Sequence, residues 1–489
     1  MYWQNVLKWA KSDYVKLVPI LGLAFYLAFI PHQNYPYPVH VDEWTHLACS
    51  NEIIKEAKAF DLTDPLQGGP PIGNQLVEVG FHTFWAAFHL TSDIDWFTIF
   101  KYFPSVMFMF TVLSVYVLAK RRGFGWEAAL LTCLIPTTIG VLGPGFLIPV
   151  AMGLPFIVVS IFIAFYLRNW WSYVLLAIFT LFLLSLHSAT AVGLILILIP
   201  YIIINLKGGF KHSLGMILAL IIPFVASLII IPEIKNLIVS SLKTLLVQQS
   251  VPTYVDIPDI ITAYGYLPIL LCLLGAFLLM TKRSKTNYGL VLGLVVLLMM
   301  YAIFQNYGYG IWPLYNRSLQ YVCLVMSIVA GAGLMGVKVF TLPTLFRSWV
   351  KSRFIINNAG RILCVIIIVV MLYLAIPARQ QTYYYHIIDN ADYKAFIWIR
   401  DNLGSEYEKV ILDPWKGAPF TAITGKNVYA WIMGKSEEDD RSAYAFLSSG
   451  CKDTDFLEKN GISIVYTREV CDNPNLVEVE KNIYLLEEH

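Results

Sequence analysis

Long apolar runs separated by short charged clusters dominate the chain up to about residue 377. A bilayer core of roughly 30 Å is crossed by about 20 apolar residues in a helix, so runs of this length predict membrane spans. About eleven such runs occur, at residues 17–31, 97–118, 126–142, 147–167, 170–186, 188–206, 213–231, 260–280, 288–304, 319–340 and 362–376. The pattern therefore predicts a polytopic α-helical membrane protein.

The fifth and sixth spans lie in one continuous apolar stretch. From Trp171 to Ile204 the chain has 34 residues without Lys, Arg, Asp or Glu. A single helix of that length would be about 50 Å long at 1.5 Å per residue, which exceeds the bilayer core. We therefore expect the helix to break near His187 and Ser188.

Lys and Arg residues are distributed unevenly between the two sides of these spans. With a cytoplasmic N-terminus, the inner segments hold seventeen of them, whereas the outer loops and outer helix ends before the tail hold six. Because positive residues concentrate in cytoplasmic loops, this predicts a multi-pass protein of the cell membrane. It also places loop 32–96 and the C-terminal region outside the cytoplasm. The first apolar run, near Leu17, lacks an A-x-A-like exit, so we expect a retained span and not a cleaved signal peptide.

Loop 32–96 and the C-terminal region both show the patterns of folded structure. The loop has helical apolar spacing at 42–60 and 75–90, around a turn-rich stretch, which predicts two interfacial helices. After a transmembrane module of residues 1–377, residues 378–489 alternate helix-like and strand-like patterns, as in a small α/β domain. The expected helices are 391–403, 419–424 and 455–460, and the expected strands are 409–412, 428–431 and 462–467.

Composition and cysteine placement narrow the class of protein. Hydrophobic residues make up 57% of the chain and charged residues 14%, against roughly 25% charged in soluble domains. A net charge of +2 is too balanced to indicate a nucleic-acid partner. Cys451 and Cys471 are the two cysteines of the predicted outer domain, with 19 residues between them. An oxidising compartment then predicts a disulfide between them.

The densest cluster of reactive side chains is His40-Val-Asp-Glu-Trp-Thr-His46, at the start of the first outer loop. On a helix that begins near Asp42, Asp42 and His46 lie four residues apart and share a face. Glu43 points about 100° away. One acid and one histidine could therefore face a cavity together. The alternative is helix capping, with Asp42 as the N-cap residue and Glu43 in the first turn.

Other polar candidates lie on the second loop helix and at the outer ends of spans. Glu78 and His82 are again four residues apart, and a solvated interfacial face is the alternative explanation. His187 lies at the predicted break, and Arg317 at the outer start of a late span, in Tyr-Asn-Arg-Ser-Leu-Gln. Ionisable residues inside membrane segments are rare and often functional. A helix-end histidine and a snorkelling arginine are the alternatives here.

The predicted topology brings these residues from four stretches of chain to one outer leaflet. They are His40, Asp42, Glu43, His46, Glu78, His82, His187 and Arg317. A carboxylate there can remove a proton from an acceptor hydroxyl. A guanidinium can hold the phosphate of a lipid leaving group.

This layout resembles the GT-C superfamily of membrane glycosyltransferases, of prokaryotic type, which use polyprenyl-phosphate-linked sugars. Protein O-mannosyltransferases and the aminoarabinose transferase of lipid A share the multi-span core, the long first loop and an acidic residue at its start. Asp42-Glu43 occupies that position, and Arg317 matches a lipid-phosphate contact. The Leu-His-Ser-Ala-Thr run around His187 resembles an intramembrane H-x-x-T element, and the tail around Asp413-Pro-Trp is similar as well. The tail has no W-W-D-Y-G motif, which argues against an oligosaccharyltransferase proper.

The resemblance implies a glycosyltransferase that moves a sugar from a polyprenyl phosphate or diphosphate to a lipid, glycan or protein acceptor. Asp42 and Glu43 are the expected catalytic residues. The expected substrate-binding residues are His40, His46, Glu78, His82, His187, Tyr315, Arg317 and Gln320. The resemblance implies no particular cofactor with certainty. A divalent ion such as Mg²⁺ or Mn²⁺, held by Asp42 and His46 with Glu78 or His82, would be a helper, since a carboxylate base needs no metal.

Three other classes remain open from the sequence. A transporter or flippase of lipid-linked or polar substrates usually shows internal repeats and polar residues at mid-membrane, and neither is evident. A membrane metalloprotease would have to use Asp-Glu-Trp-Thr-His at 42–46 in place of H-E-x-x-H, with aspartate as the first ligand. A non-catalytic assembly protein is the third.

Overall fold

The computed structural model describes residues 13–60, 62–70, 78–137, 143–230, 243, 247–248, 264–341, 352–381, 386–432, 434 and 436–487. Contacts divide the chain into two compact units. The transmembrane unit is Met1–Gln33 with Tyr102–Tyr383, and the loop–tail unit is Asn34–Lys101 with Tyr384–His489. We describe each unit by itself. The sequence division at 377/378 stays a prediction of where the membrane-spanning module ends.

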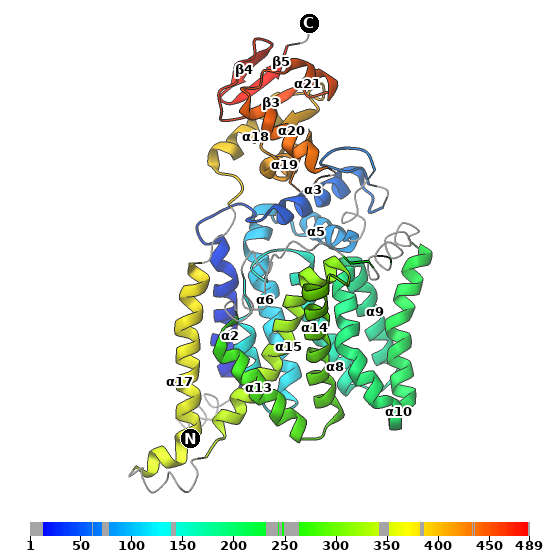
Figure 1. Cartoon of the computed structure of the whole chain (residues 1–489), viewed down its shortest axis with the longest axis vertical. Helices are drawn as coiled ribbons and strands as arrows, with labels where there is room; N and C mark the ends of the chain where they lie inside the picture. The colour runs from blue at the N-terminus through cyan, green and yellow to red at the C-terminus, as the bar shows by residue number, and fades with distance from the viewer. Residues whose placement is uncertain are drawn as a thin grey trace. The chain divides into compact units, whose positions relative to one another are not determined.

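Long apolar helices build the transmembrane unit (Figure 1). They are α2 Asp13–Phe29, α6 Trp96–Lys120, α8 Pro149–Tyr166, α9 Trp170–Leu186, α10 Ser188–Ile230, α13 Tyr266–Thr281, α14 Lys285–Tyr307, α15 Trp312–Lys338 and α17 Arg353–Gln380. Within the described residues, seven helices are long and apolar enough to cross a membrane, and α9 and α13 are shorter apolar helices. The prediction of a multi-pass helical membrane protein is confirmed.

The expected break between the fifth and sixth spans is present. His187 ends α9 in an extended conformation, with φ −166° and ψ 103°, and α10 begins at Ser188. A second interruption lies inside α10, where Lys207, Gly208 and Gly209 leave the helical region. Gly208 has a φ of 94°, which glycine adopts without steric cost. The spans predicted at 188–206 and 213–231 are therefore two helical segments.

The span predicted at 126–142 is not a long helix. It contains α7 Gly125–Thr132, which has 8 residues and is therefore only about 12 Å long. Cys133 to Thr137 are not helical, and residues 138–142 lie outside the described chain. Pro136 explains the early end, since proline disfavours a helical conformation at the residue before it. The apolar run at 126–142 therefore does not form one continuous helix.

Helix α15 is the central element of the transmembrane unit. It packs against α7, α8, α10, α13, α14 and α17. A side-chain carbon at Gly331 would clash with Ala128 of α7, and one at Gly333 with the backbone of Leu271 on α13. Small residues at such contacts let membrane helices approach closely. The residues at the start of α15, including Arg317, are therefore set on a tightly packed helix.

The loop–tail unit contains both predicted loop helices, α3 Val41–Glu56 and α5 Val79–Ser92. The tail adds α18 Asn390–Asn402, β1 Lys409–Ile411, η3 Pro414–Lys416, α19 Gly417–Thr424, β2 Asn427–Val428, α20 Glu437–Ser448, α21 Thr454–Lys459, β3 Ile464–Tyr466, β4 Leu476–Glu480 and β5 Ile483–Leu486. The expected small α/β domain is confirmed. Helix α20 and the β4–β5 hairpin were not predicted.

The tail folds around one five-stranded sheet, in the order β2-β1-β3-β5-β4. Strand β1 is parallel to β2 and β3, whereas β5 is antiparallel to β3 and β4. Neighbouring residues of β3 face opposite sides of the sheet, as a strand requires. Val465 packs in a core with α20 and α21, and the Tyr466 ring contacts Phe396 of α18. Both faces of the sheet are therefore covered.

The first loop packs directly on this tail domain. The Leu66 carbonyl accepts a hydrogen bond of 2.7 Å from the Val428 amide of β2. The side chain of Asn51 on α3 donates to the Ala422 carbonyl of α19 at 3.1 Å. The Asn51 bond fixes α3 against α19, and the Leu66 bond fixes the later part of the loop against β2. A disulfide joins Cys451 to Cys471, and Cys451 lies in the apolar core beneath α20.

Candidate active site

Helix α3 begins with a capping box that involves the acidic pair. His40 is the N-cap residue, and its Nδ1 accepts a 3.1 Å hydrogen bond from the Asp42 amide. Oε2 of Glu43 accepts bonds from the amides of Val39 at 2.7 Å and His40 at 3.2 Å. Such reciprocal bonds satisfy the open donors of a helix start. Asp42 is therefore not the N-cap residue, and Glu43 stabilises the turn on which Asp42 stands.

Asp42 lies on the first turn of α3 and is 9% exposed. Its Oδ1 lies 3.7 Å from Nδ1 of His40. His40, Asp42 and Glu43 therefore form one local group, in which Asp42 lies beside His40. Of the two carboxylates, Glu43 is fully buried and bonded to backbone, which leaves Asp42 as the better placed candidate for proton transfer.

A second group joins α3 to the start of α5. His46 Nδ1 lies 2.9 Å from His82 Nε2 and 3.8 Å from Glu78 Oε2. Burial lowers the pKa of His82 to about 3, so its imidazole is neutral at physiological pH. These three residues could hold a metal ion, and across the described part of the chain no other set of three such ligands is found. The set does not include Asp42, where the sequence placed the helper ion.

A third group lies in the transmembrane unit, between α9, α10 and α15. His187 Nδ1 is 2.7 Å from Thr190 Oγ1, and that oxygen is 2.8 Å from the Tyr321 hydroxyl. Arg317 lies one turn before Tyr321 on α15, and its charge acts on both His187 and Tyr321. The structure thus brings together His187 and Arg317, which are 130 positions apart in the chain. Tyr321 was not selected from the sequence as a site residue. Its hydroxyl group within an apolar run was the only feature that could have indicated it.

Tyr315 and Gln320 complete the predicted residues of α15. The Tyr315 hydroxyl donates to Gln305 Oε1 of α14 at 2.7 Å. Its ring stacks on Tyr301 and Phe304, with centroids 5.0 and 4.3 Å away. Gln320 is 1% exposed. Tyr315 therefore fastens the start of α15 to α14.

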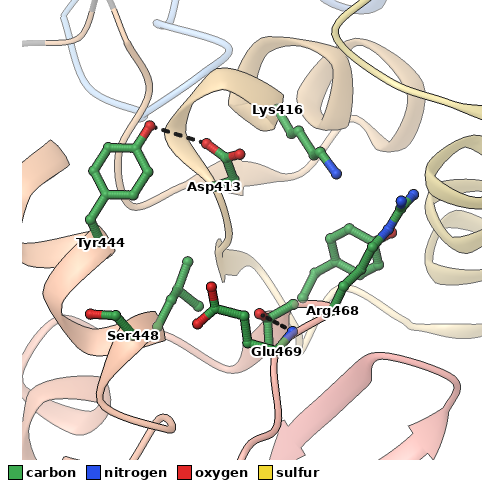
Figure 2. Close-up of a pocket in the computed structure, with 9 residues that line it drawn as sticks. Asp413, Lys416, Tyr444, Ser448, Arg468 and Glu469 are labelled. Atoms are coloured by element: carbon green, nitrogen blue, oxygen red, sulfur yellow. Dashed lines mark hydrogen bonds between the residues drawn. The ribbon is translucent and has the colours of Figure 1, made fainter.

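A polar pocket of about 310 Å³ opens on the tail domain (Figure 2). It is lined by Asp413, Lys416, Tyr444, Leu447, Ser448, Tyr466, Thr467, Arg468 and Glu469. The Tyr444 hydroxyl donates to Asp413 at 3.2 Å. Figure 2 shows Tyr444 and Ser448 on the α20 side, with Lys416 and Arg468 on the other. The pocket offers hydroxyls and both signs of charge, and the sequence did not single it out.

An ion network fixes the basic wall of this pocket. Asp392 is 2% exposed, and its Oδ1 receives Lys416 Nζ at 2.8 Å and the Tyr466 hydroxyl at 2.7 Å. Arg468 lies 2.8 Å from the same oxygen. It also bonds Asp389, which holds the pKa of that carboxyl well below its usual range. Both cations are therefore held in place by buried or capping carboxylates.

Comparison with known proteins gives the class of fold. No protein-family model and no curated protein matches the chain. The solved oligosaccharyltransferase of Archaeoglobus fulgidus in the apo form aligns over 94% of this chain and 70% of its own, with a TM-score of 0.62 and 12% identity. AglB from the same organism, with an inhibitory peptide and a dolichol-phosphate, aligns over 94% and 69%, with a TM-score of 0.64 and 13% identity.

A second type of solved structure matches the chain from end to end. ArnT from Cupriavidus metallidurans, bound to undecaprenyl phosphate, aligns over 97% of this chain and 98% of its own, with a TM-score of 0.55 and 13% identity. The chain therefore has the fold of the GT-C membrane glycosyltransferases. At this level of identity the likeness concerns the fold.

Proposed function

We propose that this protein is a glycosyltransferase that moves a sugar from a polyprenyl-phosphate-linked donor to an acceptor hydroxyl. The observation that carries the proposal is the GT-C fold over nearly the whole chain. The neighbouring structures include complexes with dolichol-phosphate and undecaprenyl phosphate. Asp42 on the first turn of α3 supplies a carboxylate in the loop, and Arg317 supplies a cation on α15.

The transmembrane unit binds the donor in this proposal. Arg317 pairs with the lipid phosphate, because a guanidinium forms strong charge-assisted bonds to phosphate oxygens. His187 and Tyr321 lie within range of its charge and are joined through Thr190. As the sugar leaves, negative charge grows on the phosphate, and Arg317 stabilises it in the transition state.

The loop–tail unit supplies the base. The acceptor oxygen forms a bond to the anomeric carbon while the bond from that carbon to the phosphate oxygen breaks. The electron pair leaves with the lipid phosphate, and the acceptor's proton passes to Asp42. A single displacement of this kind inverts the anomeric configuration. Glu43 acts as a positioning residue, because its backbone bonds hold the turn that carries Asp42.

The test is transfer by purified protein in lipid nanodiscs, with total polyprenyl-linked sugars as donor and mass spectrometry as readout. Wild type and Asp93→Asn should release polyprenyl phosphate at similar rates, whereas Asp42→Asn should release it about two to four powers of ten more slowly. Asp93 is an exposed acid of the same loop in a left-handed conformation, which asparagine tolerates, so it is a matched control. Transfer by Asp42→Asn at the wild-type rate would refute the mechanism.

The pocket of Figure 2 is the acceptor site in this proposal. Ser448 lies at its rim on α20 and is exposed, so Ser448→Trp should fill it. The KM for the acceptor should rise while donor affinity stays unchanged. Ser449→Trp changes the neighbouring exposed serine, which does not line the pocket. An equal effect of both changes would remove the pocket from the proposal.

We also propose that the N-terminus is cytoplasmic and that loop 32–96 and the tail are extracytoplasmic. The support is the Lys and Arg bias of the loops. An impermeant maleimide should label Ser92→Cys on intact cells, and Lys282→Cys only after permeabilisation. Background is low, because the free cysteines are buried and the other two are bridged. The opposite labelling pattern would reverse the orientation.

A further inference from the structure

Three potential metal ligands converge between the two loop helices. His46 projects from α3, His82 from α5, and Glu78 stands at the N-cap of α5. Their ligand atoms all lie within 4.8 Å of one another. His46 and His82 are 7% and 2% exposed. We propose that these residues bind one divalent transition metal ion of the zinc type, which joins α3 to α5.

Two of the three ligand separations lie near those of a tetrahedral ion. Zinc lies about 2.0–2.2 Å from histidine nitrogen and carboxylate oxygen, so two ligand atoms at the tetrahedral angle are roughly 3.3 Å apart. The two imidazole nitrogens are 2.9 Å apart, and His46 Nδ1 is 3.8 Å from Glu78 Oε2. One separation must open and the other close by about half an ångström each. Rotation of the Glu78 side chain at the helix start can supply that shift.

The chemical type of the three ligand atoms determines which class of metal ion the site prefers. Imidazole suits zinc and its neighbours among the transition metals, whereas Mg²⁺ and Mn²⁺ prefer oxygen ligands. Two histidines and one glutamate also form a known zinc ligand set that leaves a fourth position for water. This departs from the Mg²⁺ or Mn²⁺ helper at Asp42 that the sequence predicted.

A hydrogen bond between the two imidazoles is the competing explanation. One shared proton joins His46 to His82 and accounts for their 2.9 Å separation. That bond involves only the two imidazoles, whereas Glu78 Oε2 also lies 3.8 Å from His46 Nδ1. A metal ion engages all three groups at once. Neutral imidazoles are the form that binds a metal.

The position of the ion gives it a structural role with a consequence for catalysis. His46 follows Asp42 by four residues, so both lie on the same face of α3. An ion bound at His46 therefore fixes the turn that carries Asp42 relative to α5. The metal site stands on the ligand geometry alone, whereas this positioning role rests on the proposed function.

The first test measures metal without any substrate. Full-length protein in nanodiscs is stripped with chelator, dialysed against ZnCl₂ or MgCl₂, and analysed for bound metal. Wild type should retain about one zinc per chain and no magnesium. His82→Gln and Glu78→Gln should weaken zinc binding at least about 100-fold. His89→Gln is the matched control, since His89 lies on α5 but bonds the Ile94 carbonyl, and it should bind zinc normally.

Two further readouts separate this site from the transfer mechanism. Cobalt bound in place of zinc should give the visible absorption of a four-coordinate ion in wild type but not in Glu78→Gln. Asp42→Asn should keep its zinc while losing transfer. Equal zinc binding by wild type and both ligand variants, each folded by size-exclusion chromatography, would overturn the metal site. Zinc-bound protein that transfers no sugar would refute the proposed function and leave the site intact.

Discussion

The transmembrane unit and the loop–tail unit join their polar side chains differently. In the transmembrane unit most of the described polar side-chain pairs are neutral, such as Thr190 with Tyr321 and Tyr264 with Ser327, and the buried Glu127, paired with Lys338, is a charged exception. The loop–tail unit buries a full charge at Asp392 and surrounds it with Lys416 and Arg468. Neutral hydrogen bonds between helices avoid the large cost of charge in lipid. The buried charge of Asp392 needs partners of opposite sign.

This difference indicates which unit can carry the proton acceptor of a transfer reaction and which can bind the anionic headgroup of the donor. A carboxylate is stabilised at a helix N-terminus, because the partial positive charge there attracts a negative side chain. The tail and loop offer such places, and the α3 turn with Asp42 is one of them. The transmembrane unit instead keeps a single guanidinium on α15 beside hydroxyl and imidazole groups, which suits an anionic headgroup.

The division of roles is tested most strongly by comparing Asp42→Asn with Arg317→Ala. Asp42→Asn removes the base and keeps its shape, so kcat should fall by about two to four powers of ten with little change in donor KM. Arg317→Ala should raise donor KM as well as lower kcat, because it removes a phosphate contact. Initial rates over a range of donor concentrations measure both. If the two variants show the same kinetic pattern, the units do not divide the reaction.

The disulfide should matter to the loop–tail unit alone. Replacing Cys451 and Cys471 by serine opens a loop that spans a sequence separation of 20, which costs about 3 kcal/mol of unfolding free energy in the chain-entropy model. Proteolysis of the tail in urea should show this loss, while the helical signal of the transmembrane unit persists. Reductant should bring wild type to the stability of the variant and leave the variant unchanged. Loss of both signals together would show that the units unfold as one.

A neutral hydrogen bond in the transmembrane unit should have a smaller effect. Tyr321→Phe removes the hydroxyl that bonds Thr190, and such a bond contributes about 1 kcal/mol. Thermal unfolding of the helices should shift down by about 1–2 °C. Tyr373→Phe on α17 is the control, since this ring is 76% exposed. A shift as large for Tyr373 as for Tyr321 would contradict the assignment.

The smallest expected effect concerns the acidic start of α20. Partial burial, with Asp439 and Glu437 close by, raises the pKa of Asp440 to about 6, from about 3.9 in an unfolded chain. The folded state therefore holds this proton more tightly, and the resulting stability is lost as pH rises from 4 to 6. Asp440→Asn should raise the stability of the tail at pH 8 but not at pH 4, by under about 1 kcal/mol because the group is only partly buried and solvent screens its charge. Glu438→Gln, on an exposed face, should show no such pH dependence.

Periodicity was enough to predict most helices, because lipid and a buried core both impose an apolar face on them. It failed at 126–142, where proline ended the helix within an apolar run that hydropathy cannot divide. It also missed α20, although Ser436 caps a run of acids there. It missed the hairpin of β4 and β5 as well, although Val477 to Glu480 alternate apolar and charged residues, and the structure leaves most of β4 exposed.

The candidate site was predictable only where its residues are close in sequence. His40 to Glu43 form one turn, and Glu78 with His82 form another, so helical spacing revealed them. Asp392 gave no such signal, because its partners Lys416 and Arg468 come 24 and 76 residues later. A single sequence does not show which cationic side chain forms an ion pair with which distant carboxylate. Tyr321 is hidden for the same reason, since Thr190 lies 131 residues away.

The loop–tail unit is assembled from two segments that the ribosome makes far apart in time. The Tyr35 hydroxyl donates a hydrogen bond to the carbonyl of Ile388, a separation of 353 residues. The Leu66 carbonyl likewise accepts a hydrogen bond from the amide of Val428, which is synthesised much later. At about 5–20 residues per second, the partner of Tyr35 is synthesised roughly 20–70 s after Tyr35 itself. Helix α3 therefore reaches its native support only when synthesis is nearly complete. Shortened chains that contain every helix up to α17 should insert in the membrane and yet leave Asp42 on an unsupported loop.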